Sequence, residues 1–114
     1  MLNQFCHIEI FSKSVDESAA FYSKLFGWKT TPMMPEYMLY DGAGGIGGGF
    51  STFLKEDNRH CLYIHVEDID AKLKEIEAAG GQTIKPKSKI SDEHGYMALF
   101  LDPHGTAMGL WSQN

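Results

Sequence analysis

The sequence predicts an α+β fold in which two βαβββ modules form mainly antiparallel, curved sheets around a cup, with the helices outside. Three observations predict it. The two halves of the chain repeat each other, each half opens with an alternating strand followed by a capped helix, and residues 95–111 form a closing strand-turn-strand. We expect a single domain over residues 1–114, with module one over about 1–57 and module two over about 58–114.

The internal repeat appears at an offset of 54 residues, where the helix-capping Ser14 matches Asp68 and the helix-ending Gly27 matches Gly81. The first strand of each half carries aliphatic side chains on one face, which we expect to meet the helix. The other face mixes polar and aromatic residues: His7, Glu9 and Phe11 in module one, and Cys61, Tyr63 and His65 in module two. A sheet with one helix-covered face and one semi-polar face favours a small-molecule pocket.

Module one begins with an alternating strand over 5–11, followed by a helix that Ser14 caps and Gly27 ends. Short strands are expected over 28–31, stopped by Pro32, and over 36–40 and 50–54. The glycine-rich residues 44–49 lack the Lys-Ser/Thr of a phosphate loop and do not open a helix. They predict a turn and strand whose backbone lies close to a ligand or a partner strand.

Module two begins with a strand over 61–66 and a helix from Asp68 to the glycine pair at 80–81. A short strand over 82–85 should end at Pro86, and the lysines at 85, 87 and 89 are interpreted as a solvated edge on a loop. The closing hairpin pairs 96–101 with 106–111 around the turn Asp102-Pro-His-Gly105.

Several segments together resemble the vicinal oxygen chelate superfamily, which includes glyoxalase I, extradiol dioxygenases and bleomycin-binding proteins. These segments are Phe21-Tyr-Ser-Lys-Leu-Phe-Gly-Trp28, Val66-Glu-Asp-Ile-Asp70 and Asp102-Pro-His-Gly-Thr-Ala-Met-Gly-Leu-Trp111, with a histidine on the first strand. The resemblance covers essentially the whole chain, and its ending looks like the glyoxalase-like group. It implies homodimers, which the open sheet edges and the exposed apolar cup also favour.

The resemblance also implies a divalent metal held by the first and last strands of each module. Carried over position by position, these ligands fall on His7, Cys61, Gly49 and Gly109. Glycine has no side chain to coordinate a metal, so the usual site is predicted to be degenerate. No cofactor and no metal are expected, with His7 the one candidate ligand. A divalent metal remains possible through a rearranged site that also uses Glu9 and His65.

The expected ligand pocket is lined by His7, Glu9, Phe50, Cys61, Tyr63, His65, Phe100 and Trp111. His7 is the candidate catalytic residue, as base or metal ligand, and a hydrogen-bonded pocket histidine is the alternative. Cys61 is interpreted first as a small buried hydrophobic residue, the commonest role of a free cysteine.

Composition excludes several classes of partner. A net charge of -5 with scattered Lys and Arg argues against nucleic acid. No apolar run approaches a membrane span, and residues 1–4 do not resemble a signal peptide. Two cysteines without metal-type spacing fit a reduced compartment. We therefore expect a cytoplasmic protein.

Two functions remain open at this point. One is a glyoxalase-related protein that binds a small molecule in the cup, as a lyase or isomerase acting on an oxygenated metabolite. The other is a non-catalytic protein that sequesters a small molecule or antibiotic, as the bleomycin-resistance type does. Phe50, Tyr63, Phe100 and Trp111 would then supply stacking surfaces.

Overall fold

The computed structural model describes residues 2–53 and 60–114. It divides into two compact units, Cys6–Leu62 and Met1–Phe5 with Tyr63–Asn114. The elements of module one are β1 (Phe5–Phe11), α1 (Val15–Phe26), β2 (Thr30–Met34), β3 (Tyr37–Tyr40), the short 3-10 turn η1 (Gly42–Gly44) and β4 (Gly48–Ser51). The elements of module two are β5 (His60–His65), α2 (Ile69–Ala78), β6 (Gln82–Ser91), β7 (Gly95–Leu101) and β8 (Ala107–Ser112). The boundaries between the two units fall within β1, after Phe5, and within β5, after Leu62.

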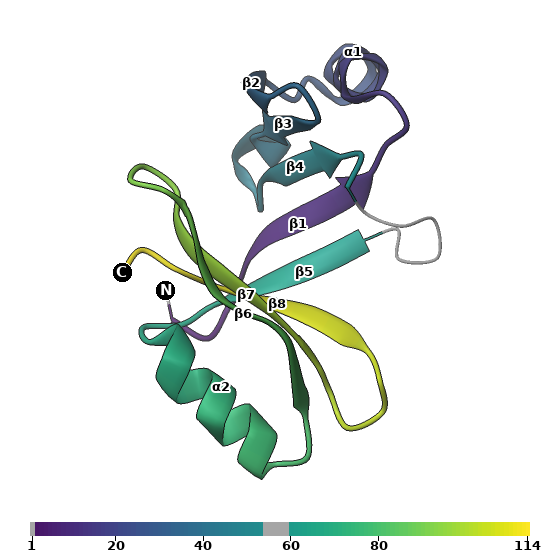
Figure 1. The fold of residues 1–114 in the computed structure, drawn as a ribbon. Coiled ribbons are helices and arrows are strands. Elements are labelled where there is room, and N and C mark those ends of the chain that lie inside the picture. The colour runs from purple at the N-terminus through teal and green to yellow at the C-terminus, as the bar shows by residue number, and fades with distance from the viewer. Residues whose placement is uncertain (1, 54–59) are drawn as a thin grey trace. The chain divides into compact units, whose positions relative to one another are not determined.

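Each module contains one helix and four strands in the same order (Figure 1). In module one β2 pairs with β3 and β3 with β4, both antiparallel, and β4 pairs with β1 in parallel. In module two β6 pairs with β7 and β7 with β8, both antiparallel, and β8 pairs with β5 in parallel. The predicted α+β class with two βαβββ modules is therefore confirmed.

Helix α1 begins where the sequence predicts, because the Ser14 hydroxyl accepts a hydrogen bond from the Glu17 N–H at 3.3 Å. It ends at Gly27, whose φ of 74° is the left-handed conformation that glycine adopts without strain. One face of α1 packs on β3 and β4. This gives module one a core of Val15, Ala19, Met38, Tyr40 and Phe50, with Ile10, Tyr22 and Trp28 against it.

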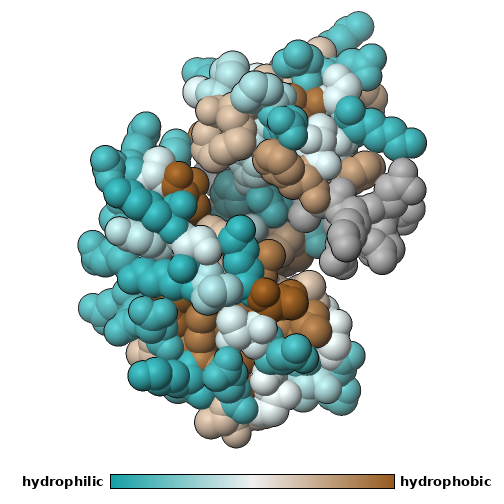
Figure 2. All heavy atoms as spheres, viewed as in Figure 1, coloured by the Kyte–Doolittle hydropathy of each residue, from teal (hydrophilic) through white to brown (hydrophobic). Residues whose placement is uncertain are grey.

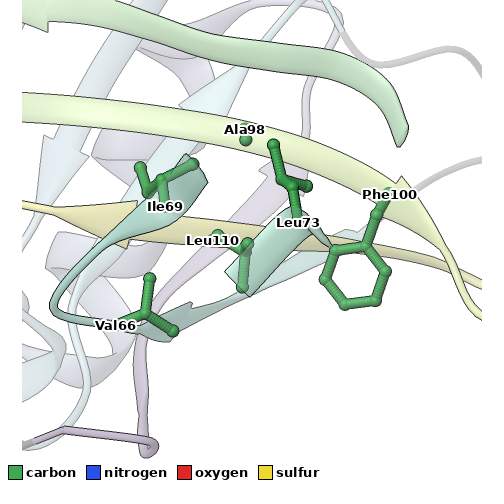
Figure 3. Packing of buried hydrophobic residues seen from close by; sticks show 6 residues of the cluster. All are labelled: Val66, Ile69, Leu73, Ala98, Phe100 and Leu110. Carbon is green, nitrogen blue, oxygen red and sulfur yellow. The ribbon is translucent and has the colours of Figure 1, made fainter. Parts of the chain in front are cut away.

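Helix α2 is capped by the Asp68 carboxylate, which accepts a hydrogen bond from the Ala71 N–H at 3.0 Å. It packs on one face of the strands of module two. Ile69 and Leu73 point from the helix toward the strands in Figure 3. The core of module two consists of Val66, Ile69, Leu73, Ala98, Phe100 and Leu110.

The structure corrects both predictions that a proline would stop a strand. Strand β2 continues through Pro32 to Met34, and β6 continues through Pro86 to Ser91, so the three lysines lie on a strand and not on a loop. Among the described strands β2 pairs only with β3 and β6 only with β7, and the pairing register shifts beside each proline. Proline is tolerated there because an edge strand and a bulge both leave backbone N–H groups outside the ladder.

The turn between β7 and β8 forms as the sequence predicts. The Asp102 carboxylate accepts hydrogen bonds from the N–H of Thr106 at 3.0 Å and of His104 at 2.9 Å. These donors hold the pKa of Asp102 below its ordinary value, the Thr106 contribution being the larger.

The surface in view mixes hydrophilic and hydrophobic residues in small patches (Figure 2). Three large apolar side chains of α1, those of Phe21, Leu25 and Phe26, are more than half exposed. In the described part of the chain, neither helix is long and apolar enough to cross a membrane.

Candidate functional site

The glycines of β4 allow two tyrosines of β3 to reach across that strand toward β1. Strand β4 lies between β3 and β1, with Gly48 opposite Tyr40 and Gly49 opposite Leu39. A Cβ on Gly48 would lie 2.6 Å from the Tyr40 hydroxyl, and a Cβ on Gly49 would overlap the ring of Tyr37. The predicted close approach to a partner strand is confirmed at Gly48, where an added Cβ would overlap the backbone carbonyl oxygen of Ile8 on β1, and tyrosine side chains also approach Gly48 and Gly49.

The two tyrosines use this space on opposite faces of the sheet. Tyr40 belongs to the helix-side core, and its hydroxyl donates a hydrogen bond to the carbonyl oxygen of Ile8 at 2.7 Å. Burial, with smaller contributions from Tyr22 and Glu9, raises the pKa of Tyr40 to about 12. Tyr37 lies on the helix-free face, where His7 and Glu9 also lie.

On that face, His7, Tyr37 and Glu9 form one polar cluster. The Nε2 atom of His7 lies 2.6 Å from the Tyr37 hydroxyl oxygen, and the planes of the two rings are nearly parallel, at an angle of 11°. The Tyr37 side chain also hydrogen-bonds the Glu9 carboxyl group. Tyr37 is only 7% exposed, and burial, followed by the charge and hydrogen bond of Glu9, raises its pKa far above the ordinary value.

The hydrogen-bond directions in this cluster follow from the chemistry of its members. An ionised Glu9 carboxylate can only accept, so the single phenolic proton of Tyr37 is donated to it. The direction of the contact between Nε2 of His7 and the phenolic oxygen depends on the imidazole tautomer, and the tautomer that carries its proton on Nε2 donates to that oxygen. The raised pKa keeps the Tyr37 phenol in its neutral form beside Glu9 and His7.

In module two a tyrosine ring also lies over a glycine of a neighbouring strand, and here the two strands are β5 and β8. Tyr63 on β5 lies opposite Gly109 on β8, and a Cβ on Gly109 would overlap the ring of Tyr63. The predicted last-strand ligand positions, Gly49 and Gly109, are therefore each covered by a tyrosine ring of their own module. A longer side chain at either position would have to displace that ring.

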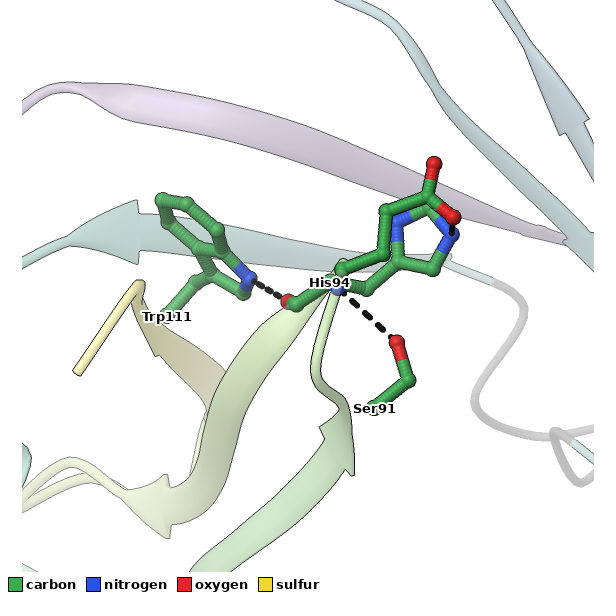
Figure 4. Close-up of polar contacts among 4 residues, drawn as sticks. Ser91, His94 and Trp111 are labelled. Carbon is green, nitrogen blue, oxygen red and sulfur yellow. Dashed lines mark hydrogen bonds and ion pairs between the residues drawn. The ribbon is translucent and has the colours of Figure 1, made fainter.

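Trp111 forms an aromatic surface on the helix-free face of module two. Its indole N–H donates a hydrogen bond to the backbone carbonyl of His94 at 2.6 Å, and the N–H of His94 donates to the Ser91 hydroxyl at 2.8 Å (Figure 4). The ring of His65, directly opposite on β5, lies 5.0 Å from that of Trp111. The carbonyl of His65 accepts a hydrogen bond from the N–H of Asn3, so the N-terminal segment also holds this strand.

The structure corrects two of the predicted pocket residues. Phe50 is fully buried in the core under α1, and Phe100 is buried in the core under α2. Both lie on the helix side of their strands, because side chains alternate between the two faces and the pairing register places them opposite the pocket face. Neither is available to stack on a ligand.

The remaining predicted residues are placed as follows. His7 and Glu9 lie together in the module-one cluster, and Tyr63, His65 and Trp111 share the helix-free face of module two. Cys61 is 6% exposed, which suits the interpretation as a small buried residue, and its role in a pocket stays a prediction.

Sequence reasoning missed Tyr37 as a member of the site. The signal that could have found it is the pairing of a tyrosine-containing strand with a glycine-rich strand, since glycine leaves room for a large ring on the neighbouring strand.

The donor set does not fit a metal held in the manner that the resemblance implies. Gly49 and Gly109 offer no ligand, and the ring of Tyr37 or Tyr63 fills the adjacent space. Within residues 2–53 and 60–114, no group of three His, Cys, Asp or Glu side chains converges on a common point.

Comparison with known proteins places this fold and these strands in a family. Residues 4–110 match the sequence model of the Glyoxalase/Bleomycin resistance protein/Dioxygenase superfamily. CFP32 of Mycobacterium tuberculosis, provisionally named a glyoxylase, is 31% identical over 124 residues, covering 90% of this chain and 43% of that protein. The anthracycline biosynthesis protein DnrV of Streptomyces peucetius is 28% identical over 120 residues, covering 88% and 43%. The chain thus spans less than half the length of these curated relatives.

Solved structures share the fold at low sequence identity. The Mn(II)-bound glyoxalase from Novosphingobium aromaticivorans has a TM-score of 0.74 at 17% identity, covering 98% of this chain and 39% of that one. Methylmalonyl-CoA epimerase from Mycobacterium tuberculosis has a TM-score of 0.75 at 14% identity, covering 96% and 87%. With its two βαβββ modules and its match over residues 4–110, this chain belongs to the Glyoxalase/Bleomycin resistance protein/Dioxygenase superfamily.

Proposed function

We propose that this protein binds a small, partly aromatic organic molecule on the helix-free face of its sheet strands. The observation that carries this proposal is the fixed ring of Trp111, which is partly exposed and is held by the carbonyl of His94 and the ring of His65. Because the indole N–H is already bonded within the protein, the ring offers a ligand its flat apolar surface. Stacking on a preorganised ring costs little conformational entropy.

Two further observations support a binding role over a glyoxalase reaction with the usual metal. The last-strand positions Gly49 and Gly109 lack metal ligands, and tyrosine rings cover them. DnrV, one of the relatives, is named for the biosynthesis of anthracyclines, which are aromatic compounds. An aromatic ligand for this chain is consistent with both.

Calorimetric titration with an anthracycline, bleomycin, methylmalonyl-CoA and a 2-oxoaldehyde tests the proposal. We expect an aromatic compound to bind, and Trp111→Leu to weaken its binding about tenfold. Phe53→Leu is the matched control, because Phe53 is an exposed aromatic residue that belongs to neither proposed surface, and it should leave the affinity unchanged. Equal affinity in wild type and Trp111→Leu, or binding of none of the aromatic compounds, contradicts the proposal.

A second candidate function is a lyase or isomerase acting on an oxygenated metabolite, with His7 as the catalytic residue. The observation that favours it is the hydrogen-bonded set of His7, Tyr37 and Glu9, because an imidazole and a carboxylate on one face are suited to proton transfer. This function is supported if the wild type turns over methylmalonyl-CoA or the 2-oxoaldehyde and His7→Ala does not. Binding without turnover leaves the sequestering role.

We also propose that the protein forms a homodimer. The more than half-exposed apolar side chains of Phe21, Leu25 and Phe26 on α1 support association, since exposed large apolar residues gathered on one helix favour burial. Light scattering coupled to size-exclusion chromatography measures the mass, and a monomer at micromolar concentration contradicts the proposal.

A further inference from the structure

Strand β6 carries its three lysines on two different faces of module two. Thr83 lies opposite Phe100 on β7, and its hydroxyl donates a hydrogen bond to the Glu77 carboxylate of α2 at 2.6 Å, so Thr83 faces the helix. Regular alternation would place Lys85 on the same face, two residues later. The pairing register shifts between Thr83 and Lys85, and Lys85 instead lies opposite Leu99 on the helix-free face.

A second register shift follows Lys85 and returns the other two lysines to the helix side. There Lys89 lies opposite Tyr96, which packs against the core under α2. The ammonium group of Lys87 lies over the Tyr96 ring, 4.6 Å from its centroid, and Lys89 forms an ion pair with Asp92. Lys85 is exposed and forms no ion pair with any residue that the structure describes.

Lys85 shares the helix-free face of module two with the ring of Trp111. Trp111 on β8 lies opposite Met97 on β7. In the next row of this face, Gly109 lies opposite Leu99, and Leu99 lies opposite Lys85. Two strand spacings and a step of two residues place the backbones of Trp111 and Lys85 about 12 Å apart. The partly buried side chains of Met97 and Leu99 lie between them.

The two ends of this face differ in charge. The turn after β6 carries Asp92 and Glu93, and the Glu93 carboxylate lies 3.9 Å from Nε2 of His94, whose backbone carbonyl holds the Trp111 indole. Among the described strand residues that are paired on this face, Lys85 is the one with a formal charge at neutral pH. An anionic group of a ligand is therefore disfavoured at the turn and favoured toward Lys85.

We propose that the molecule bound at Trp111 is an aromatic anion. Its flat ring system stacks on Trp111, an apolar segment covers Met97 and Leu99, and a carboxylate, sulfonate or phosphate group pairs with Lys85. The four-carbon stem of the lysine lets its ammonium group meet an anion roughly 6–12 Å from the indole. This inference rests on the proposed function, and it adds the charge of the ligand and the residue that selects it.

The register shifts support this assignment. A β-bulge disrupts the hydrogen-bonded ladder, and bulges are over-represented beside functional sites, where they change the direction of a side chain. Without the shift after Thr83, alternation would place Lys85 on the side of α2, and the paired positions of the helix-free face would carry no cation. The shift thus provides the one positive charge that lies within reach of a ligand on Trp111.

Fluorescence titration of the full chain with 1-pyrenebutanoate and 1-pyrenebutanol at low ionic strength tests the inference. The two probes share the ring and the spacer and differ in charge. We expect the acid to bind about three- to fivefold more tightly than the alcohol, as for an exposed ion pair, and this preference to disappear at high salt. Lys85→Gln should remove the preference by weakening the acid alone, and Lys85→Glu should reverse it.

Lys87→Glu is the matched control, because it changes the net charge as Lys85→Glu does but lies on the helix side of the same strand. It should keep the preference for the acid. Trp111→Leu should weaken both probes, which measures the proposed function separately. Equal affinities for the two probes, both weakened in Trp111→Leu, would leave the aromatic surface standing and overturn the inference. A preference for the acid that survives Lys85→Glu also overturns it, and binding of neither probe contradicts both proposals.

Discussion

Tyr40 on β3 donates its hydroxyl hydrogen to the backbone carbonyl of Ile8 on β1, across the intervening Gly48 of β4. The contact joins two strands that are not neighbours in the module. Because the contact uses the phenolic proton, ionisation of Tyr40 at alkaline pH would remove it and lower the stability of module one.

Stability should fall as the pH rises from about 10 to about 12. The pKa of Tyr40 is raised to about 12 in the folded protein, while an unfolded tyrosine titrates near 10. A group whose folded pKa is raised stabilises the protein fully below its unfolded pKa, and this stabilisation is lost as the pH passes through the folded pKa. Urea unfolding at pH 8 to 12 measures this, and Tyr40→Phe should make the loss less steep without removing it, because Tyr37, whose pKa is raised further, contributes to the same loss. An equally steep loss in Tyr40→Phe would assign the effect to other groups.

Gly109→Ala should destabilise the protein by about 1–3 kcal/mol, because the new Cβ overlaps the ring of Tyr63 and overpacks a buried contact. In a Tyr63→Ala background the same substitution should cost much less, since the ring is gone. Gly45→Ala is a comparison with a smaller expected cost, because Gly45 has a negative φ and its added Cβ would make one tight contact without overlap, 3.3 Å from the carbonyl oxygen of Gly42. Chemical denaturation of the four variants gives the coupling energy. A coupling energy near zero would mean that the ring of Tyr63 does not determine the cost of a larger side chain at position 109.

Phe50→Ala should destabilise the protein by about 3–5 kcal/mol, because Phe50 is fully buried in the core under α1. Phe53→Ala removes the same side chain from a position that is 59% exposed and should change stability by no more than about 0.5 kcal/mol. Thermal and urea unfolding measure both. Similar costs for the two substitutions would contradict the placement of Phe50 in the core.

Asp68→Ala should cost about 1 kcal/mol, because it removes the carboxylate that accepts the Ala71 N–H at the start of α2. Asp68→Asn keeps an accepting oxygen and should recover most of the loss. Glu67→Ala, one residue earlier and outside the helix, is the control. Urea midpoints report the differences, and a loss as large for Asn as for Ala would assign the effect to charge instead of capping.

Much of the fold could be predicted because its signals are local. Ser14, Gly27 and Asp68 act as helix caps through contacts within a few residues, and alternation identifies the strand faces. The predicted stops at Pro32 and Pro86 were wrong because a proline ends a central strand but is tolerated on an edge strand. Which strands are edges depends on pairing between distant segments, and no local pattern encodes it.

The candidate site was less predictable for the same reason. His7 and Glu9 were found because they alternate along one strand, but their partner Tyr37 lies about 30 residues away and meets them across a third strand. Phe50 was expected to line the pocket, but it lies in the core on the helix side of β4. Without the register opposite β3, its direction could not be known.

The tyrosine rings over Gly49 and Gly109 restrict the order in which this lineage could acquire a last-strand carboxylate. An acidic residue introduced at Gly109 while Tyr63 is present would collide with the ring, so selection would meet a destabilised protein before any new ligand could act. A smaller residue at position 63 would remove that collision. The same order applies to Tyr37 and Gly49. Mutational paths to such a carboxylate therefore begin at the aromatic residues.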